Sequence, residues 1–276
     1  MVGKDMSLEE MDFQTLLKKI HNERGIDFSQ YRPRGLKRRI STRLRARDCS
    51  SYRNYIAVLN RDQGEYERLL SAIFINVTEF FRNPCVFEII EKNLIPEIIS
   101  KKEQGARKTI RVWSAGVSFG EESYSLAILF YEVLKERIND FTIKIFATDI
   151  DVECMERARL GSYGKNSLKN VRPQLFHKYF SFVNGNYVVD DKLRLLITYR
   201  RHNIISDTPL RHMDLILCRN VAIYFTKPLQ EKLLYNLTYA LNSGGFLVLG
   251  NVESLWGDLR KSFKVIDNRE RIYQKI

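Results

Sequence analysis

The hydrophobic and polar positions divide the chain into a helical first part and a longer part in which strands and helices alternate. In the first part, apolar side chains recur every three or four positions, the spacing of helices with one buried face. Three such sets occur: Phe13, Leu16, Leu17 and Ile20; Tyr52, Tyr55, Ile56 and Leu59; and Tyr66, Leu69, Leu70, Ile73 and Phe74. Ser7 and Glu10 form a capping box before the first set. We therefore expect residues 1–80 to form a small all-α domain.

The second part, residues 81–276, begins with a predicted helix over 86–99 and then alternates between strands and helices. Short apolar strands are predicted at 111–115, 144–151, 214–218 and 246–250, and helices after Gly120, after Asp151 and at 228–241. Two apolar segments, 263–266 and 271–274, flank a charged turn and predict a closing hairpin. Strand–helix units followed by an antiparallel pair predict an α/β fold of the Rossmann-like class I methyltransferase type.

One stretch interrupts this alternation. Residues 182–189, FVNGNYVV, hold an Asn-Gly pair between apolar residues, which is a strong hairpin signal. Residues 192–199 supply a possible third strand. We expect a small antiparallel β-subdomain inserted at about residues 180–202 of the α/β domain. Such an insertion either recognises a partner or covers an edge of the main sheet.

The composition points to an acidic partner. The 276 residues include 44% hydrophobic residues, enough for a sizeable core, and carry a formal net charge of +12 with a pI near 9.5. No apolar run reaches the length of a membrane span, and the N-terminus lacks a signal peptide pattern. The cysteines Cys49, Cys85, Cys154 and Cys218 are scattered, with no CxxC and no His at ligand spacing. We expect a cytoplasmic protein with reduced cysteines and no metal site.

A basic segment, YRPRGLKRRISTRLRARD, lies between the predicted N-terminal helices. Leu36, Ile40 and Leu44 form a narrow apolar stripe, and Arg39, Arg43 and Arg47 form a parallel row of like charges, with further basic residues nearby, among them Arg34, Lys37, Arg38 and Arg45. Like charges four residues apart destabilise a lone helix by about 0.2–0.5 kcal/mol per pair. With almost no interleaved carboxylate, the row is expected to face an external anionic surface, either a nucleic acid or an acidic helical protein. The alternative is a solvated basic face.

The turn after the first strand carries candidate chemistry. Gly116 and Gly120 stand four residues apart, so the turn is not a GxGxxG, and Glu121 and Glu122 follow directly. A pyrophosphate needs bare N–H groups at a helix N-terminus and no nearby anion. The two acids favour a ligand with cationic and hydroxyl groups, such as S-adenosylmethionine. Alternatively, they only stabilise the positive end of the helix dipole.

Polar residues also follow the later strands. Asp149 ends the second predicted strand, where a carboxylate can accept hydrogen bonds from ribose hydroxyls, while Asp151 is expected to cap the next helix. Arg219, Asn220 and Tyr224 follow the strand at 214–218, at the edge where open α/β sheets bind ligands.

The linker INVTEFFRNP joins the two predicted domains. It contains Asn76, Thr78, Glu79 and Arg82 among aromatic residues. Arg82 could hold a carboxylate through its guanidinium group. The alternative for this polar set is a helix cap and a surface salt bridge.

Four motifs, NVTEFFRNP, RVWSAGVSFGEESYSLA, FATDIDVECMERARLGSY and DLILCRNVAIYF, together resemble the bacterial chemotaxis receptor methyltransferases, the CheR family. They occur in the family's order over residues 76–225, and the basic helical domain and GGFLVLGNVESL also fit. The resemblance implies an S-adenosylmethionine-dependent enzyme that methylates glutamates on the cytoplasmic helical bundle of chemoreceptors. Its products would be glutamyl 5-O-methyl esters and S-adenosylhomocysteine. It also implies a cytoplasmic monomer recruited to membrane receptor clusters, without nucleic acid or membrane insertion.

The resemblance also assigns roles to individual positions. The implied cofactor-binding residues are Asn76, Thr78, Arg82, Glu122, Asp149, Asn203, Ile204, Arg219 and Asn220. The implied catalytic residues are Arg82, Arg219 and Tyr224, and the implied receptor-docking residues are Arg38, Arg39, Arg43 and Arg45. The chain departs from the family's usual STGEEPYS at Phe119 and Ser123. We expect Phe119, which is bulkier than threonine, to narrow or reshape the pocket.

Two other classes of function remain possible at this point. A non-catalytic adaptor could keep the cofactor pocket as a sensor or bind receptors only. An RNA or DNA methyltransferase would share the fold and the positive charge, but it would call for a base-stacking pocket. A nicotinamide-dependent oxidoreductase is disfavoured because the GxGxxG is missing.

Overall fold

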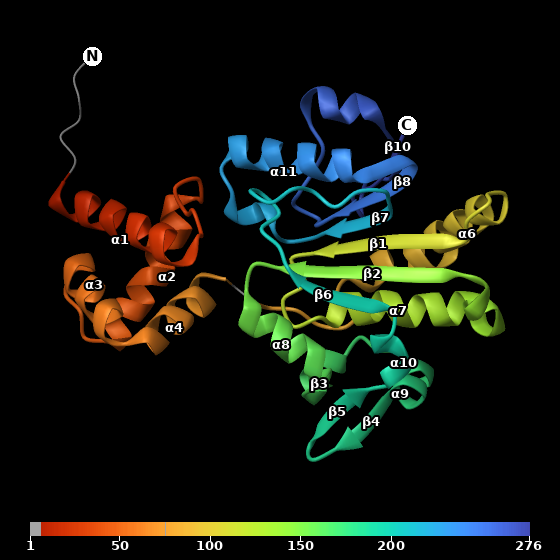
Figure 1. The fold of residues 1–276 in the computed structure, drawn as a ribbon, viewed down its shortest axis with the longest axis horizontal. Coiled ribbons are helices and arrows are strands. Elements are labelled where there is room, and N and C mark those ends of the chain that lie inside the picture. Colours follow the sequence, from red (N-terminus) through yellow and green to blue (C-terminus); the bar gives the residue numbers. More distant parts are fainter. Residues whose placement is uncertain (1–6, 75) are drawn as a thin grey trace. The chain divides into compact units, whose positions relative to one another are not determined.

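A computed structural model describes residues 7–74 and 76–276 (Figure 1). The chain forms two compact units. The first contains the described residues up to Phe74 together with Tyr224–Gln230, and the second contains Asn76–Ile223 and Glu231–Ile276. The boundary therefore lies near residue 75 rather than at the expected 80, and the first unit also includes a short segment from the C-terminal half. Within the described residues, no helix is both long enough and apolar enough to cross a membrane.

The N-terminal unit is all-α, as the apolar spacing predicts. Its helices are α1 (Leu8–Arg24), α2 (Pro33–Ala46), α3 (Tyr52–Arg61) and α4 (Gln63–Ile73). Ser7 accepts a hydrogen bond from the Glu10 N–H at the start of α1, which confirms the predicted cap. The segment Tyr224–Gln230 joins this unit through main-chain bonds, since the Arg32 N–H donates to Tyr224 O (2.9 Å) and the Thr226 N–H to Gln30 O (3.0 Å).

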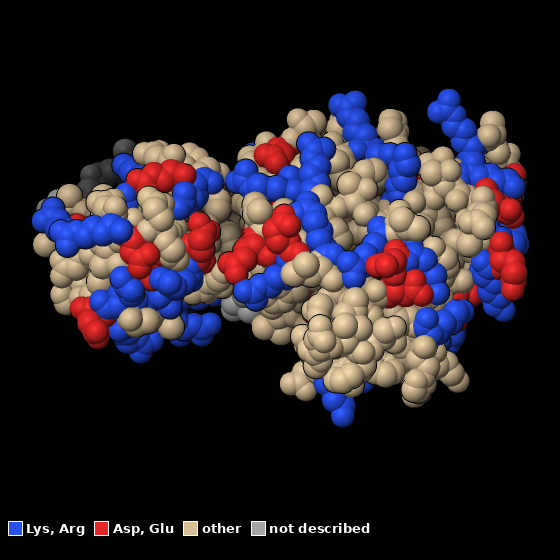
Figure 2. All heavy atoms as spheres, turned by 60° about the horizontal axis from the view of Figure 1, so that its bottom comes forward, with Lys and Arg blue, Asp and Glu red and all other residues tan. Residues whose placement is uncertain are grey.

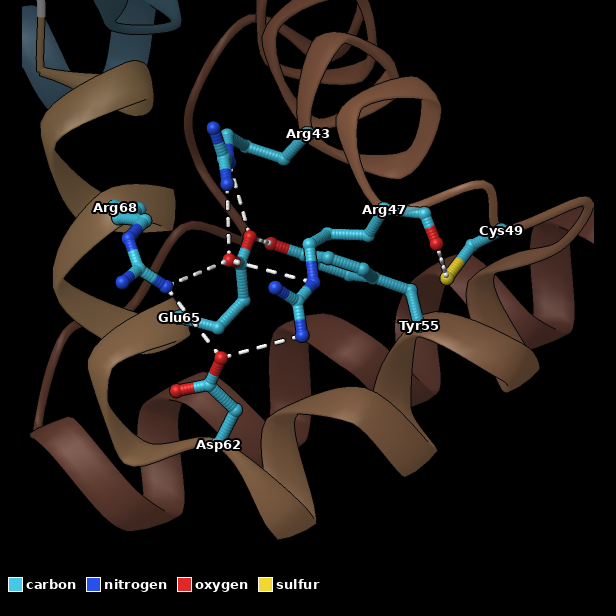
Figure 3. Close-up of polar contacts among 7 residues, drawn as sticks. All are labelled: Arg43, Arg47, Cys49, Tyr55, Asp62, Glu65 and Arg68. Carbon is cyan, nitrogen blue, oxygen red and sulfur yellow. Dashed lines mark hydrogen bonds and ion pairs between the residues drawn. The ribbon is translucent and has the colours of Figure 1, made fainter.

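A buried carboxylate, Glu65 of α4, gathers arginines from α2, from the residue after α2 and from α4 itself (Figure 3). Arg43 donates two hydrogen bonds of 2.9 Å to it, and the Tyr55 hydroxyl donates a third of 2.7 Å. Arg47 lies 3.8 Å from the same carboxylate and 3.2 Å from Asp62. The expectation that Arg43 faces outward is therefore wrong, because Glu65 of α4 supplies the carboxylate that α2 lacks, whereas Arg47 is paired but remains exposed.

The other predicted docking residues are Arg38, Arg39 and Arg45, and they differ in where their charge lies. Arg39 donates to the Ile73 carbonyl (2.7 Å), and its guanidinium lies 4.5 Å from the centre of the Tyr224 ring, so it also faces its own unit. Arg38 and Arg45 are exposed. Only these two of the four expected docking residues present their charge mainly to solvent.

The C-terminal unit is built on a seven-stranded sheet with the order β6-β2-β1-β7-β8-β10-β9. The strands in that order are Ile197–Arg201, Thr142–Asp149, Thr109–Ala115, Met213–Cys218, Leu241–Leu249, Ile272–Lys275 and Phe263–Asp267. Neighbouring strands from β6 to β8 are parallel, and β10 is antiparallel to both β8 and β9. This arrangement confirms the predicted class I methyltransferase fold and its closing hairpin.

Helices pack against this sheet, and those over 84–103 and 121–134 share one apolar core with its strands (Figure 1). The helices are α5 (Pro84–Ile89), a π-helical segment (Ile90–Leu94), α6 (Ile95–Glu103), α7 (Glu121–Leu134), α8 (Val152–Leu160) and α11 (Lys227–Ala240). Short 3₁₀ turns cover Lys135–Asp140, Lys165–Leu168, Ala222–Tyr224 and Gly257–Ser262. The helix α7 is buried on nearly every side, so its apolar residues cover most of its surface instead of one stripe.

A second, three-stranded sheet forms the insertion. It has the order β3 (Ser162–Tyr163), β5 (Asn186–Val189), β4 (Phe180–Val183), and short helices α9 (Pro173–Tyr179) and α10 (Asp191–Arg194) flank the hairpin in sequence. The Asn-Gly hairpin is confirmed. The expected third strand is wrong, because Ile197–Arg201 pairs with β2 in the main sheet. The hairpin itself contains no charged residue, and Figure 2 shows a largely uncharged surface at this end of the unit.

The Glu65 cluster gives a stability prediction. Burial opposes ionisation of Glu65, but the bonds from Arg43 and Tyr55 outweigh it and hold its pKa below the usual value. Its contribution to stability is therefore present above the ordinary glutamate pKa and is lost as pH falls through the depressed one. We expect Glu65→Gln to lower the free energy of unfolding at pH 7 by about 3–5 kcal/mol, because Arg43 loses its buried partner. Urea unfolding measures this, and Glu67→Gln, on an exposed side chain of the same helix, is the control. A loss below about 0.5 kcal/mol, the scale of surface substitutions, would contradict the prediction.

Candidate functional site

Three parallel strands of the main sheet, β2, β1 and β7, bring their carboxyl ends to one edge. The turn after β1 is tied to β2, since the N–H groups of Gly116 and Val117 donate to the Thr148 carbonyl (2.8 and 3.1 Å). Gly116 has a φ of 77°, and a Cβ there would come within 2.5 Å of Val221 Cγ2. Glycine is therefore required for this turn to approach the loop after β7.

Asp149, the last residue of β2, faces this turn. Its carboxylate accepts the Ser118 N–H on Oδ2 (2.8 Å) and the Asp151 N–H on Oδ1 (3.0 Å). Desolvation raises the pKa of Asp149, and these main-chain bonds counteract the rise. A carboxylate has about four acceptor positions, so Asp149 keeps acceptor capacity for a ligand hydroxyl. The Ser118 hydroxyl beside it is buried and has no hydrogen-bond partner among the described residues. This donor and acceptor set fits a ribose.

Glu122 and Arg219 form an ion pair across the same edge. Arg219 Nη1 lies 3.3 Å from Glu122 Oε2, and the Ser114 hydroxyl donates to Glu122 Oε1 (2.7 Å). The Arg219 side chain is only 2% exposed. Its other terminal nitrogen donates to the Arg82 carbonyl (2.9 Å) and to Asn83 Oδ1 (2.7 Å). A buried guanidinium paired with a carboxylate can hold a ligand that carries both an ammonium and a carboxylate.

The linker reaches this pair through Arg82 and Asn83, and its polar side chains are engaged within the protein. Arg82 contributes its carbonyl to Arg219, while its own guanidinium donates to the Val77 carbonyl (2.8 Å). The Asn76 amide donates to Asp151 Oδ2 (3.0 Å). Asp151 caps α8 by accepting the Cys154 N–H, which confirms its predicted structural role.

Glu121, the neighbour of Glu122, lies in a different environment. Its side chain is buried, and Oε2 has no hydrogen-bond partner among the described residues. Burial raises its pKa to about 7, and the nearby Thr78 and Ser167 side chains oppose the rise. The two adjacent acids of this helix therefore have separate roles, and only Glu122 meets Arg219.

Asn203 and Ile204 follow β6 at the same edge of the sheet. The His202 N–H donates to the Asp149 carbonyl (2.9 Å), which brings this turn beside β2. Asn203 Oδ1 accepts the N–H groups of Ile205 and Ser206, so this side chain shapes the turn. The Ile204 carbonyl accepts from the Asn236 amide (3.0 Å).

Two residues of the predicted site lie differently from the expectation. Tyr224 is counted with the N-terminal unit, where its ring lies beside Arg39. Phe119 packs at the margin of the apolar core of the second unit, and the Arg157 guanidinium lies 5.6 Å from the centre of its ring. These contacts direct the Phe119 ring to the core and α8, so they give no support for a narrowed pocket.

Sequence reasoning also missed residues of the site. Ser114, Asn83 and Glu253 each bind a residue that the motifs did identify, and Glu253 accepts the Asn220 N–H (3.1 Å). Glu253 follows the predicted strand at 246–250, but this position alone does not reveal its main-chain partners. Ser114 and Asn83 carry no comparable signal.

Comparison with known families decides the assignment. Residues 76–272 match the CheR methyltransferase, SAM binding domain, and residues 11–74 match the CheR methyltransferase, all-alpha domain. The chain belongs to the CheR methyltransferase family. It is an S-adenosylmethionine-dependent methyltransferase, and S-adenosylmethionine is its cofactor.

Individual relatives agree with the family. The chain is 30% identical to a chemotaxis protein methyltransferase of Listeria monocytogenes, over 89% of this chain and 91% of that protein. It is 31% identical to chemotaxis protein methyltransferase 2 of Pseudomonas aeruginosa, over 88% of this chain and 86% of that protein. It is also 34% identical to an uncharacterized 104.1 kDa protein of Rhodobacter capsulatus, of which it spans only 26%.

The raised pKa of Glu121 predicts a pH-dependent stability of this CheR domain. The pKa rises from 4.5 to about 7 on folding, so the unfolded chain ionises first. Protonated Glu121 can be buried without the cost of burying a charge. This contribution to the free energy of unfolding is complete below pH 4.5 and is lost as pH rises through 7. At about 1.4 kcal/mol per pKa unit, Glu121→Gln should make the protein more stable than the wild type by about 3 kcal/mol at pH 8. The difference should vanish near pH 4.

Denaturant unfolding between pH 4 and pH 8 measures this difference. Glu88→Gln, on an exposed side chain of the same unit, should leave the pH profile unchanged. A Glu121→Gln profile parallel to that of the wild type would show that Glu121 does not titrate in this range.

Proposed function

We propose that the chain methylates glutamate side chains on the cytoplasmic helical bundle of chemoreceptors, giving glutamyl 5-O-methyl esters and S-adenosylhomocysteine. The observation that carries the proposal is the likeness, along most of both chains, to proteins named chemotaxis protein methyltransferases. The enzyme would act in the cytoplasm as a monomer at membrane receptor clusters, without binding nucleic acid.

The polar edge of the main sheet supports a specific arrangement of the cofactor. Asp149 would accept hydrogen bonds from the ribose hydroxyls, and the turn at Asn203 and Ile204 would border the adenine. Glu122 would meet the ammonium of the amino-acid part, and Arg219 would meet its carboxylate. Asn76, Thr78, Arg82 and Asn220 would line the remainder of this site. Asp149, Glu122 and Arg219 each have the charge that their part of the cofactor needs.

The chemistry needs few groups from the protein. When bound, S-adenosylmethionine supplies a methyl group activated by its positive sulfur. A substrate glutamate is already ionised at neutral pH, so no general base is required. The protein's task is to exclude water and to align the two reactants, an effect of about 7–11 kcal/mol in well-oriented systems. Arg82 and Arg219 are the proposed residues for this alignment.

Two surfaces support docking to a receptor. Arg38 and Arg45 are exposed on α2, so they are available to an acidic helical bundle. Figure 2 shows basic side chains gathered on the surface of the N-terminal unit. The uncharged hairpin of the small sheet exposes Phe182 and Val183 by 65% and 46%, a feature typical of contact surfaces.

The role of Asp149 can be tested by binding. We expect Asp149→Ala to weaken the binding of S-adenosylhomocysteine by about 1.5–3 kcal/mol, the scale of hydrogen bonds to a charged group. Isothermal titration calorimetry measures the affinity. Asp190→Ala is the control, because Asp190 caps α10 without taking part in the proposed site. Equal affinity in the wild type and Asp149→Ala would remove Asp149 from the cofactor site.

The docking role of α2 can be tested by charge reversal. We expect the pair Arg38→Glu and Arg45→Glu to reduce methyl transfer to receptor fragments at least tenfold, because the acidic partner is then repelled. Affinity for S-adenosylhomocysteine should not change. The pair Arg53→Glu and Arg61→Glu on α3 is the matched control, with the same change of charge in the same unit.

A competition assay separates the receptor from a nucleic acid. Labelled S-adenosylmethionine is offered with receptor-containing membranes, and base-labile methyl release is measured with excess RNA or excess acidic receptor fragment. Inhibition by the receptor fragment and little by RNA supports the proposal. Label in the RNA, or equal losses in both charge-reversal pairs, would count against it.

A further inference from the structure

Glu253 is a buried carboxylate that lies just beyond β8 and outside the proposed set of cofactor contacts. Its side chain accepts three main-chain N–H groups, from Ala222 (2.7 Å), Gly250 (2.8 Å) and Asn220 (3.1 Å). Burial raises its pKa, and these main-chain bonds counteract the rise. The acid is therefore held by peptide groups of two loops.

These bonds join the loop after β8 to the loop after β7. Asn220 has a φ of 61°, in the left-handed region, which turns successive N–H groups of its loop toward one point. Glu253 occupies that point. Without the carboxylate, buried N–H groups of both loops would lose their partner, and the left-handed turn at Asn220 would lose its support.

The fit around Glu253 is tight. A Cβ on Gly250 would come within 2.8 Å of both Asn220 N and Glu253 Oε2. Because main chain cannot move aside as a side chain can, Gly250 is needed for the two loops to approach. The contact between the loops therefore depends on the lack of a side chain at Gly250 and on the carboxylate of Glu253.

The clamped loop begins next to Arg219. This guanidinium reaches Glu122 and Asn83, and its side chain is almost fully buried, so small shifts of its backbone would separate it from both partners. Glu253 itself touches neither Glu122 nor Asn83 in the described contacts. Its influence on the site therefore passes through the loop.

We infer that Glu253 is a positioning residue, which fixes the loop 219–222 so that Arg219 meets Glu122 in the geometry that binds the amino-acid part of the cofactor. The inference rests on the proposed placement of the cofactor at Arg219 and Glu122. It assigns a role in this site to Glu253, which lies in the loop after β8 and outside the four motifs of the sequence.

The test measures S-adenosylhomocysteine affinity by calorimetry on the full chain for four proteins and one double variant. Glu253→Gln keeps the shape but replaces one acceptor oxygen by a donor, and we expect it to weaken binding about tenfold. Asp214→Asn is the matched control. Asp214 also accepts a main-chain N–H, from Arg111 (2.9 Å), but at the opposite end of β7. We expect it to change affinity less than twofold.

A double-variant cycle identifies the route of the effect. If Glu253 acts through Arg219, Glu253→Gln should cause no further loss in an Arg219→Ala background. An equal loss in both backgrounds would overturn the inference, as would unchanged affinity in Glu253→Gln while Arg219→Ala binds weakly. Unchanged affinity in Arg219→Ala would instead overturn the proposed placement of the cofactor, and the inference with it.

Gly250→Ala provides a second route if Glu253→Gln fails to fold. It retains Glu253 but crowds both the carboxylate and Asn220 N, so it separates the two loops without removing the acid. We expect it to weaken S-adenosylhomocysteine binding at least fivefold in the wild-type background and not at all beside Arg219→Ala. Loss of the same size in both backgrounds contradicts a role through Arg219.

Discussion

The site depends on the parallel alignment of β2, β1 and β7. The residues at or just after the ends of these strands are far apart in sequence, and parallel pairing is what brings Asp149, the Gly116 turn and Arg219 to one edge. The edge also leaves peptide N–H groups beyond the last sheet bonds. Acidic side chains accept these groups, at Asp149 and at Glu253, so the same constraint that gathers the site also requires buried acids there.

The acids at this edge differ because their partners differ. Glu122 has a guanidinium and a hydroxyl as neighbours, whereas Glu121, one residue earlier, is buried among groups that compensate its charge poorly. On a helix, adjacent residues point about 100° apart, so one can face the sheet edge and the other the protein interior. Burying Glu121 as an anion lowers the free energy of unfolding. The fold is therefore less stable at the pH values where Glu121 is ionised.

The sequence is sufficient for much of the fold and for part of the site. The rule that ligand-binding residues lie at the carboxyl ends of parallel strands predicts Asp149, Arg219 and Asn220, since their positions follow from element boundaries alone. It fails for Ile197–Arg201, because the same apolar pattern suits an insertion strand and an edge strand of the main sheet. It also fails to assign Glu253 a role, because its partners are main-chain N–H groups, which every residue type carries. Interactions with the main chain leave little trace in the sequence.

The basic helix α2 also has partners that its own sequence does not reveal, and here the cause is geometric. Arg43 stands opposite Glu65, which lies on another helix, so no inspection of the basic segment alone could reveal the pair. Helix geometry nevertheless separates the arginines into two faces. Residues seven apart, such as Arg38 and Arg45, differ by about 20° around the axis, while Arg38 and Arg43 differ by about 140°. A flat partner cannot contact both faces at once. Since α4 occupies the face of Arg43, an acidic partner would meet the face of Arg38 and Arg45, which also includes the exposed Arg34.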